Sequence, residues 1–265
     1  MLPQSRRELI LRTLRADGPS EVRSLADKLG VSQATIRRDL EHLDADGKLT
    51  RVYGGAMTLD PGEVNSDING DINGDDIDDP FADVAAERAE DKDTVARAAA
   101  DMVQDGETVL LDIGTTMHRL AHHLHGKRIT VITSNLAVFD ELRDDADIEL
   151  VLLGGMVRRR YHSLVGFLTE DNLRQVHAGR LFLGTSGVRG DGAVMDTTLV
   201  EVPLKRAMIK AADQVVLVAD GGKFPGVGVA RVCGPGDLDV VVTTASADPA
   251  TRLALQEAGV DVITA

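Results

Sequence analysis

The stretch VSQATIRRDLEHLDADGKLTRVYGGAM, residues 31–57, decides the fold of the N-terminal part of the chain. Just before and within it, Gly30 can end one helix and Ser32 is a good N-cap for the next. Upstream, residues 22–29 carry apolar side chains at positions 22, 25, 26 and 29, the spacing of a helix with one buried face. The sequence therefore predicts a helix-turn-helix over about residues 20–39, a motif that lays its second helix in the major groove of DNA.

The second helix of this motif has an apolar and a polar side. Ile36, Leu40 and Leu43 are expected to face inward. The side chains left to read base edges or to contact phosphates are Ser32, Gln33, Ala34, Thr35, Arg37 and Arg38. Two arginines on a helix are more often just a solvated face, so the helix alone does not predict DNA binding.

The flanking segments favour DNA binding over that simpler interpretation. Residues 6–15 predict a first helix with Leu9, Ile10 and Leu14 facing inward. Residues 48–57 alternate like a strand and break at a glycine pair, as the hairpin of a winged helix does. Arg51 in that hairpin would lie near the adjacent phosphates or the minor groove. Residues 1–58 are therefore predicted to form a winged helix-turn-helix domain that binds double-stranded DNA.

The charge distribution fits contact with DNA at one end only. Residues 1–58 hold 10 Lys and Arg against 8 Asp and Glu, whereas the whole chain carries a net charge of −14. Asp outnumbers Glu by 31 to 12, and the chain has only seven lysines and no tryptophan. This composition favours a halophilic source, with an ordinary acidic bacterial protein as the alternative.

Other features of the composition limit the classes of protein that the chain can belong to. Its 265 residues allow more than one domain, and the single Cys233 excludes an intramolecular disulfide and a thiolate metal cluster. No signal sequence is recognisable, and no apolar run approaches the ~18 residues that span a bilayer. We therefore expect a cytoplasmic protein without membrane contact.

Residues 59–83 differ sharply from both flanks. Within them, DPGEVNSDINGDINGDDIDDPFAD (residues 60–83) has nine acidic residues, no Lys or Arg, and a repeated Ile-Asn-Gly-Asp. An EF-hand-like calcium loop is the alternative, but the twelve-residue frame with a terminal Glu is missing. The segment is interpreted as a solvated acidic linker.

Residues 84–265 alternate between short apolar strands and amphipathic helices. Strands are predicted over residues 107–112, 129–133, 148–153, 181–183, 215–219 and 240–244, and helices over residues 93–103, 203–212 and 250–258, with others after positions 114 and 135. This order predicts an α/β domain with a mostly parallel, doubly wound sheet. Ligands of such sheets bind at the carboxyl ends of the strands.

Those strand ends carry polar and glycine-containing turns. Gly114, Thr115 and Thr116 offer backbone N–H groups, hydroxyls and a helix N-terminus to a phosphate, which Lys223 could neutralise. Asp112 and Asn135 could hydrogen-bond to sugar hydroxyls. The remaining candidates at strand ends are Ser134, Gly154, Gly155, Gly187 and Asp220. Taken alone, each motif more often has only the structural role of forming a turn after a strand. Five polar strand ends in one domain favour a ligand site.

At this point the chain resembles the DeoR family of transcriptional regulators. The resemblance rests on VSQATIRRDL (residues 31–40) with Gly47, Leu49, Arg51 and Gly54-Gly55-Ala56, and on DIGTT (residues 112–116), Leu153-Gly-Gly, SLVG (residues 163–166), residues 181–187 and EVPLKRAMI (residues 201–209). The family pairs a winged helix with a C-terminal sugar-phosphate sensor that is similar in fold to ribose-5-phosphate isomerase. The acidic composition adds a resemblance to its haloarchaeal sugar- and glycerol-metabolism repressors.

The resemblance implies an effector pocket and an oligomer. Residues 84–265 would be the sensor, and Asp112, Thr115, Thr116, Asn135, Glu201, Lys205 and Lys223 would line its pocket. The family also implies a homodimer or homotetramer that represses metabolic genes. No cofactor is expected.

Two further groups of residues have alternative interpretations. One predicted helix carries four histidines close together, His118, His122, His123 and His125. The more specific interpretation is a zinc site with His118 and His122 as two of its ligands. The sequence offers no evident third ligand, so we expect histidines at the surface or pocket rim and no metal. Residues 158–161, RRRY, could touch nucleic acid or a partner, but a solvated loop or a phosphate contact is more economical.

Three functions are compared. The leading hypothesis is a DNA-binding repressor of sugar or glycerol metabolism genes, controlled by a phosphorylated sugar intermediate. The alternative is a sugar-phosphate isomerase-like enzyme with a fused DNA-binding head, in which Glu201 and Lys205 could act as base and electrophile. A third hypothesis, an architectural DNA-binding protein, leaves the polar strand ends unexplained. No catalytic residue is assigned, because a fused DNA-binding head makes sensing the simpler function.

Overall fold

The computed structural model describes residues 6–7, 9–11, 20–45, 49–52, 55–58 and 80–265. The chain divides into two compact units, residues 1–74 and residues 75–265, and each is considered by itself. The side chains of Arg37 and Arg51, both predicted to contact DNA, lie outside what the structure describes.

The N-terminal unit is a winged helix-turn-helix, as predicted. Helix α2 (Val22–Leu29) and helix α3 (Gln33–Ala45) are followed by strands β2 (Leu49–Val52) and β3 (Gly55–Thr58). The two strands pair antiparallel, and β3 also pairs with β1 (Ser20–Glu21), so the sheet order is β1-β3-β2. Residues 6–7 and 9–11 are helical as well.

The turn between α2 and α3 forms for the reasons that its residues suggest. Gly30 has φ +64°, a left-handed conformation that glycine adopts without steric cost, and Val31 N donates to Ala26 O to close the end of α2. Ser32 Oγ then accepts from Thr35 N at 3.2 Å, which caps α3. The core consists of Ile10, Leu25, Ala26, Ile36, Leu40 and Leu43. Leu9 is 40% exposed, so its predicted inward position is wrong.

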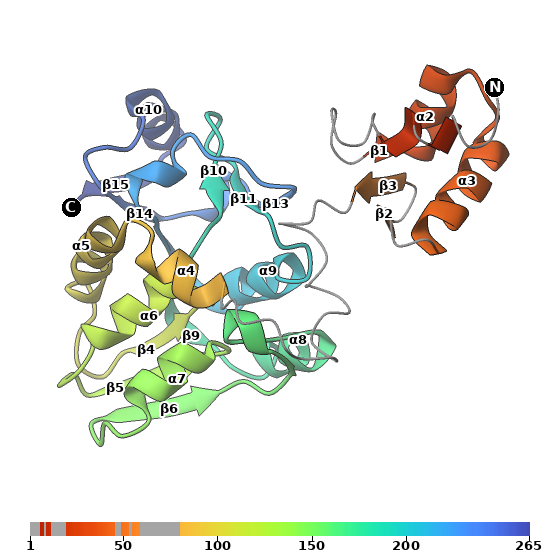
Figure 1. The fold of residues 1–265 in the computed structure, drawn as a ribbon. Coiled ribbons are helices and arrows are strands. Elements are labelled where there is room, and N and C mark those ends of the chain that lie inside the picture. The colour runs from red at the N-terminus through yellow and green to blue at the C-terminus, as the bar shows by residue number, and fades with distance from the viewer. Residues whose placement is uncertain (1–5, 8, 12–19, 46–48, 53–54, 59–79) are drawn as a thin grey trace. The chain divides into compact units, whose positions relative to one another are not determined.

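The C-terminal unit is built on a seven-stranded, entirely parallel sheet with the order β15-β14-β12-β9-β4-β5-β6 (Figure 1). Its strands are β4 (Thr108–Leu111), β5 (Ile129–Thr133), β6 (Ile148–Leu152), β9 (Ala178–Leu183), β12 (Ala212–Val218), β14 (Val240–Thr243) and β15 (Asp261–Thr264). The predicted α/β sheet is thus confirmed, although β15 was missed because its exposed edge position leaves it with little apolar sequence.

Helices cover both faces of this sheet. One face packs on α5 (Ala89–Ala100), α6 (Thr115–His122) and α7 (Leu136–Leu142), and the other on α8 (Phe167–Leu173), α9 (Val202–Lys210) and α10 (Pro249–Glu257). Neighbouring strand residues alternate between the two cores: Val109 and Leu111 belong to the first, whereas Leu110 belongs to the second. Burial on both faces explains why the strands have continuous apolar sequences.

Short elements complete the second unit. A hairpin of β7 (Met156–Arg158) and β8 (Ser163–Val165) holds the 3-10 turn η2 (Arg159–Tyr161), and β10 (Gly187–Val188), β11 (Val194–Asp196) and β13 (Ala230–Cys233) form a small sheet. Two more 3-10 turns are η3 (Gly221–Lys223) and η4 (Pro235–Asp237). These antiparallel pieces were not predicted, because two- to four-residue strands are too short for an alternating pattern to be recognised.

Helix α4 (Pro80–Ala86) changes the predicted boundary of the linker. It contacts α6 and η2, and the Phe81 ring stacks on His162 with centroids 4.8 Å apart. The expectation that residues 80–83 are solvated linker is therefore wrong, because an aromatic ring and a helix turn find partners on the second unit. Among the described residues, no helix combines the length and the apolar character that crossing a membrane requires.

Candidate functional site

The candidate site lies where the order of the parallel strands reverses. From β4 the chain adds β5 and β6 on one side, and then returns to place β9 on the other side of β4. The turns that leave β4 and β9 therefore run in opposite directions at the carboxyl ends of the strands, which is where ligands of such sheets bind. Asp112 follows β4 directly, and Gly184 follows β9.

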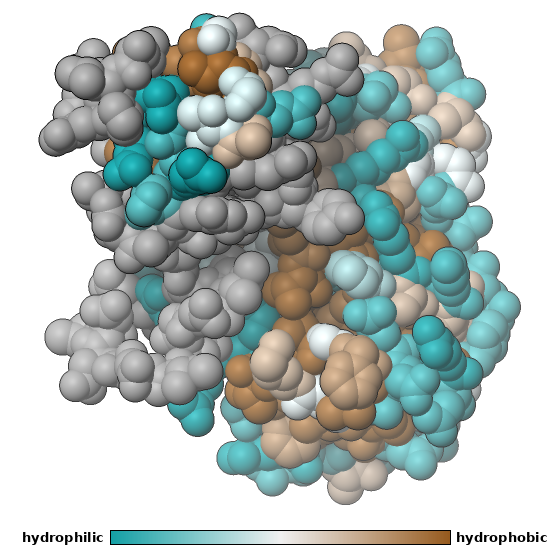
Figure 2. Space-filling view, turned by 90° about the vertical axis from the view of Figure 1, so that its right-hand side faces the viewer, coloured by the Kyte–Doolittle hydropathy of each residue, from teal (hydrophilic) through white to brown (hydrophobic). Residues whose placement is uncertain are grey.

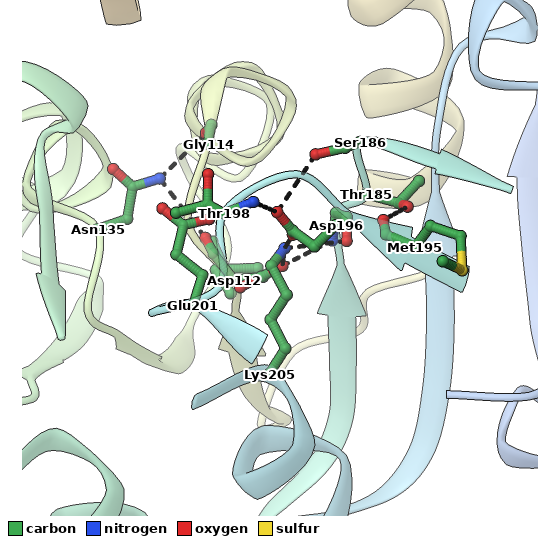
Figure 3. Close-up of polar contacts among 12 residues, drawn as sticks. Asp112, Gly114, Asn135, Thr185, Ser186, Met195, Asp196, Thr198, Glu201 and Lys205 are labelled. Carbon is green, nitrogen blue, oxygen red and sulfur yellow. Dashed lines mark hydrogen bonds and ion pairs between the residues drawn. The ribbon is translucent and has the colours of Figure 1, made fainter. Parts of the chain in front are cut away.

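A buried lysine joins the residues at these strand ends (Figure 3). Lys205 Nζ, from α9, lies 2.6 Å from Asp112 Oδ2, 3.1 Å from Gly184 O and 3.3 Å from Asp196 Oδ2. The three side chains of this ion cluster are at most 3% exposed. Burial alone lowers the pKa of Lys205, but Asp112, Asp196 and Glu201 outweigh it and raise the pKa. Lys205 is therefore a permanent cation that donates hydrogen bonds to Asp112 and to Gly184 O and forms an ion pair with Asp196.

Glu201 lies beside the ion cluster, and its ionisation depends on pH near neutrality, unlike that of Lys205. Its carboxylate pairs with the Arg158 guanidinium, which in turn lies over the Tyr161 ring, 4.1 Å from its centroid. Burial raises the pKa of Glu201 to about 7, helped by Asp196 and opposed by Lys205 and Arg158. The Glu201 carboxyl can therefore gain or lose a proton near neutral pH, as a general base could.

Asn135 is used within the chain itself. Its Oδ1 accepts from Ala137 N at 3.0 Å and from Val138 N at 3.4 Å, and so caps α7. Its Nδ2 donates to Gly114 O at 3.1 Å, which ties the turn after β5 to the turn after β4. Ser134 next to it is fully buried, and its Oγ has no hydrogen-bond partner among the described residues. Asn135 thus positions the Gly114 turn.

The N-terminus of α6 has a different character. Gly114 stands at the N-cap with φ +104°, and within the described chain no side chain caps the helix. The first N–H groups of α6 are therefore available to an anion, unlike those of α7. Thr115 is buried, and Thr116 is half-buried.

Cations gather near this helix. Lys92, from α5, is 3% exposed and donates to Val84 O, and Arg119 of α6 donates to Ala85 O at 3.0 Å. Burial lowers the pKa of Lys92, and the nearby charges of Lys223 and Arg119 lower it further. Lys223 is half-buried in η3, and Asp220 caps that turn by accepting from Gly222 N at 2.9 Å. Arg119 and Lys223 thus lie near Lys92, together with the carboxylates of Asp220 and Glu87.

A hollow of about 210 Å³ opens beside α6. Residues from α4, α5, α6 and α7 line it: Ala85, Asp93, Thr115, His118, Arg119, His122 and Glu141. Thr115 is the residue that the hollow shares with the predicted effector set. The hollow therefore adjoins the uncapped end of α6.

The predicted glycines have packing roles. A Cβ on Gly155 would lie 2.0 Å from Thr169 Oγ1, and one on Gly187 would lie 2.6 Å from Val227 N. Gly154 N donates to Asn172 Oδ1 at 2.9 Å, on α8. Gly155 and Gly187 therefore let neighbouring segments approach closely, whereas a Cβ on Gly154 would make only an ordinary contact with Asn172, 3.5 Å away.

The predicted DNA-reading face of α3 is exposed where the structure describes it. Ser32, Gln33, Ala34 and Arg38 are exposed and Thr35 is half-buried. One helical turn after Thr35, Asp39 is 2% exposed and accepts from Arg6 and Arg7, at 3.2 Å for the Arg7 Nε–Oδ1 pair. This buried ion cluster fixes the first helical segment to α3.

Sequence comparisons identify both parts of the chain. Residues 6–61 match the DeoR-like helix-turn-helix domain, and residues 87–245, more than half of the chain, match the DeoR C terminal sensor domain. The chain belongs to the DeoR family. It is therefore a DNA-binding transcriptional regulator, and the predicted resemblance is confirmed.

Curated DeoR-type relatives resemble the chain over most of their length. The HTH-type transcriptional regulator GolR of Listeria innocua is 30% identical over 99% of this chain and 98% of its own. The glycerol-3-phosphate regulon repressor of Escherichia coli is 32% identical over 81% of this chain and 80% of its own. Among solved structures, ribose 5-phosphate isomerase A of Methanocaldococcus jannaschii is 16% identical and covers 50% of this chain and 52% of its own, with a TM-score of 0.37. That last similarity carries no argument about function.

Two residues of the site were not predicted. Asp196 ends the three-residue strand β11, and no periodic signal marks so short a strand. Arg158 was noticed only as part of an arginine-rich loop, although it is 4% exposed and holds Glu201. The arginine run itself was the signal, because a buried carboxylate needs a cation beside it.

Proposed function

We propose that this DeoR-family protein is a homo-oligomeric repressor of sugar or glycerol metabolism genes that senses a phosphorylated sugar or sugar alcohol. This class of target is supported by three relatives: a glycerol-3-phosphate regulon repressor, a lactose phosphotransferase system repressor and a putative aga operon transcriptional repressor. Its target is chromosomal DNA, so it acts in the cytoplasm. Its aspartate-rich composition supports a source with high internal salt.

The observation that carries the effector assignment is the uncapped end of α6 among cations. Gly114, Thr115 and Thr116 present N–H groups and hydroxyls there, at the reversal of the strand order. Arg119 and Lys223 contribute positive charge near the buried Lys92. Phosphate is one of the anions that a helix N-terminus binds through its free N–H groups.

The sugar would extend from the phosphate toward the ion cluster of Lys205. The residues proposed to contact it are Asp112, Ser134, Gly184, Glu201 and Lys205, which are all buried, and Asp112, Gly184 and Lys205 are already hydrogen-bonded to one another. Preorganised polar groups of this kind discriminate between hydroxyl patterns, because a ligand that fails to match them leaves buried groups unpaired. Gly154, Gly155, Gly187 and Asp220 support the turns around it, and Asn135 holds Gly114 in place.

DNA recognition is assigned to α3 and the wing. The proposed contacts are Ser32, Gln33, Ala34, Thr35, Arg37 and Arg38, with Arg51 on the hairpin. The DNA-binding domains of an oligomer can take one arrangement that fits the operator and another that does not. The effector changes the affinity for the operator only if the effector itself binds these two arrangements with different affinities.

The proposed oligomer has a candidate surface on the sensor. Met156 and Val157 of β7 are 63% and 46% exposed, and Phe167 and Leu168 of α8 are 78% and 53% exposed. These residues are neighbours, because Met156 pairs with Val165 and α8 begins two residues later. Figure 2 shows hydrophobic residues gathered on the face of the molecule that it displays. Exposed apolar clusters of this kind mark protein interfaces.

The isomerase-like alternative has one observation in its favour. Glu201, with a pKa of about 7, is buried near Lys205, and such a pair could move a proton between sugar carbons. However, the Lys205 ammonium already donates to Asp112 and to Gly184 O and pairs with Asp196. NMR of aldose phosphates incubated with the protein would separate the two functions, because only an enzyme produces the ketose isomer.

The decisive experiment is operator binding with and without effector. Fluorescence anisotropy of a labelled fragment from the gene's own upstream region, at high KCl, is followed during titration with a panel of sugar phosphates. We expect specific binding that one compound changes at least several-fold. Binding that no compound in a broad panel alters would contradict the sensor assignment, and no specific binding at any salt concentration would contradict the repressor.

Two variants locate the two activities. Lys223→Ala should keep operator affinity but lose the response to the effector, since it removes a cation near the phosphate site. If Arg38 contacts a base, Arg38→Ala should weaken operator binding by about 1–3 kcal/mol. If it contacts a phosphate, the slope of log affinity against log salt concentration should fall by about one. In both cases the response to the effector should be unaffected. The matched control is Arg143→Ala, an exposed arginine of the sensor that should change neither property.

A further inference from the structure

We propose that His122, His125 and Glu141 form a binding site for a divalent transition metal, with His118 as a fourth ligand. His122 is the last residue of α6, His125 lies in the turn after it, and Glu141 lies on the neighbouring helix α7. The sequence shows the histidines but not the carboxylate, which only the packing of α7 against α6 brings beside them. The third ligand that the sequence lacked is therefore present in the fold.

The ligand atoms converge on one point. His122 Nδ1 lies 2.8 Å from Glu141 Oε1, and His125 Nε2 lies 3.2 Å from the same oxygen. His118 Nε2 lies 3.4 Å from Glu141 Oε2. One ligand atom from each of His122, His125 and Glu141 lies within 4.8 Å of the other two. Metal bonds of about 2.0–2.1 Å place the ligands of a tetrahedral zinc ion about 3.4 Å apart, so these groups need only small adjustments to coordinate one ion.

The second ring nitrogen of His125 has the partner that a metal ligand requires. His125 Nδ1 lies 2.7 Å from Asp145 Oδ2, a carboxylate whose side chain is only 12% exposed. An imidazole that donates N–H to a carboxylate directs the lone pair of its other nitrogen outward, toward Glu141 and His122. This carboxylate–histidine arrangement orients the ring for a metal and increases its basicity.

The cluster brings several imidazoles and carboxylates together. Both nitrogens of His125 face carboxylates, those of Asp145 and Glu141. Three imidazoles also converge on the single carboxylate of Glu141. A divalent cation would accept the lone pairs of the imidazoles and the charge of the carboxylate at once.

The donor set indicates the class of metal. Imidazole nitrogen with one carboxylate oxygen suits Zn²⁺, and also Co²⁺, Ni²⁺ and Cu²⁺, rather than the oxygen-only sites of Mg²⁺ and Ca²⁺. Two of the ligands are exposed, so an ion could enter directly from solvent. Since His118, His122 and Glu141 also line the hollow beside Thr115, a bound ion would link α6 to α7 beside the effector site.

Metal binding by the tag-free full-length chain tests the proposal. Titration with Zn²⁺ against a chromophoric chelator should give one tight site per chain, and Co²⁺ should produce the intense visible bands of a tetrahedral complex. Replacing both His122 and Glu141, as His122→Ala with Glu141→Gln, should remove the tight site and the Co²⁺ bands. Asp145→Asn should weaken Zn²⁺ binding by about 10- to 100-fold, because it acts through His125.

The control is His177→Ala, an exposed histidine that faces Asp213 elsewhere on the sensor. It should leave the tight site intact, and circular dichroism should show that all variants stay folded. Absence of a tight site in the wild-type chain, or equal affinity in the double variant, would overturn the proposal. None of these measurements involves DNA or a sugar phosphate, so the outcome is independent of the effector assignment.

Discussion

At the scale of single residues, the ion cluster around Lys205 is the feature on which the site depends. Its ammonium compensates the charge of Asp112 and Asp196, both of which are almost fully buried. A buried ion pair contributes little net stability, but the loss of one partner leaves the other charge without compensation. The cluster is therefore expected to tolerate substitution poorly.

Lys205→Met should lower the free energy of unfolding of the sensor by about 3–5 kcal/mol at neutral pH. The physical reason is that methionine fills the space but leaves the carboxylates uncompensated. Urea denaturation followed by circular dichroism measures the change. Lys210→Met, at an exposed position of the same helix, is the control and should have almost no effect. Similar loss in both variants would contradict the role of the cluster.

Glu201 should make stability depend on pH in a defined direction. Its pKa is raised from an ordinary value of 4.5 to about 7, so the folded chain holds this proton more tightly than the unfolded chain. The resulting stabilisation is complete below pH 4.5 and is lost as the pH rises to about 7, by about 3 kcal/mol in total.

The measurement is the difference in unfolding free energy between the wild-type chain and Glu201→Gln, which cannot ionise. That difference should shift against the wild type between pH 4.5 and pH 7, since the other titrating groups are common to both proteins. A difference that stays constant over this range would mean that Glu201 ionises with an ordinary pKa.

At the scale of elements, the N-termini of α6 and α7 differ in how they are capped. Asn135 caps α7, whereas α6 begins at Gly114 without a side-chain cap among the described residues. The same asparagine also holds Gly114 through its Nδ2. One side chain thus satisfies one helix and positions the other, whose own N–H groups remain for a ligand.

Asn135→Ala should therefore lower both stability and effector affinity. The loss of the cap costs about 0.5–2 kcal/mol in urea denaturation, and the free Gly114 turn should weaken the effector response in the anisotropy assay. Asp248→Ala is the matched control, because Asp248 caps α10 by accepting from Thr251 N at 2.8 Å. It should cost similar stability with an unchanged effector response. Equal effects on the response would exclude a positioning role for Asn135.

At the scale of the whole molecule, the apolar surface formed by Met156, Val157, Phe167 and Leu168 is the proposed contact between copies of the chain. Phe167→Asp should shift the protein to a smaller species in size-exclusion chromatography with light scattering, because a carboxylate cannot be buried there without a partner. Operator affinity should fall with it, since two linked heads bind two half-sites with avidity.

The control for this surface is Leu253→Asp. Leu253 is 55% exposed on α10, away from β7 and α8 in sequence. Its replacement should alter neither the molar mass nor the operator affinity. An unchanged molar mass for Phe167→Asp would show that the chain associates through another surface or not at all.

The sequence by itself determined the winged helix, the parallel sheet and the turn that would hold a phosphate. These depend on local patterns: Gly30 and Ser32 at a helix boundary, apolar runs of strand length, and Gly114-Thr-Thr after a strand. Charge balance and the family resemblance then linked these elements to DNA binding and sensing.

Only the tertiary structure decided which distant side chains meet. Asp112, Asp196 and Lys205 are separated by up to 93 positions, yet they share one ion cluster at the reversal of the strand order. Glu141 likewise reaches the histidines of α6 only because α7 packs beside that helix. Such contacts are set by the packing of elements, and since periodicity describes one element at a time, it cannot specify them.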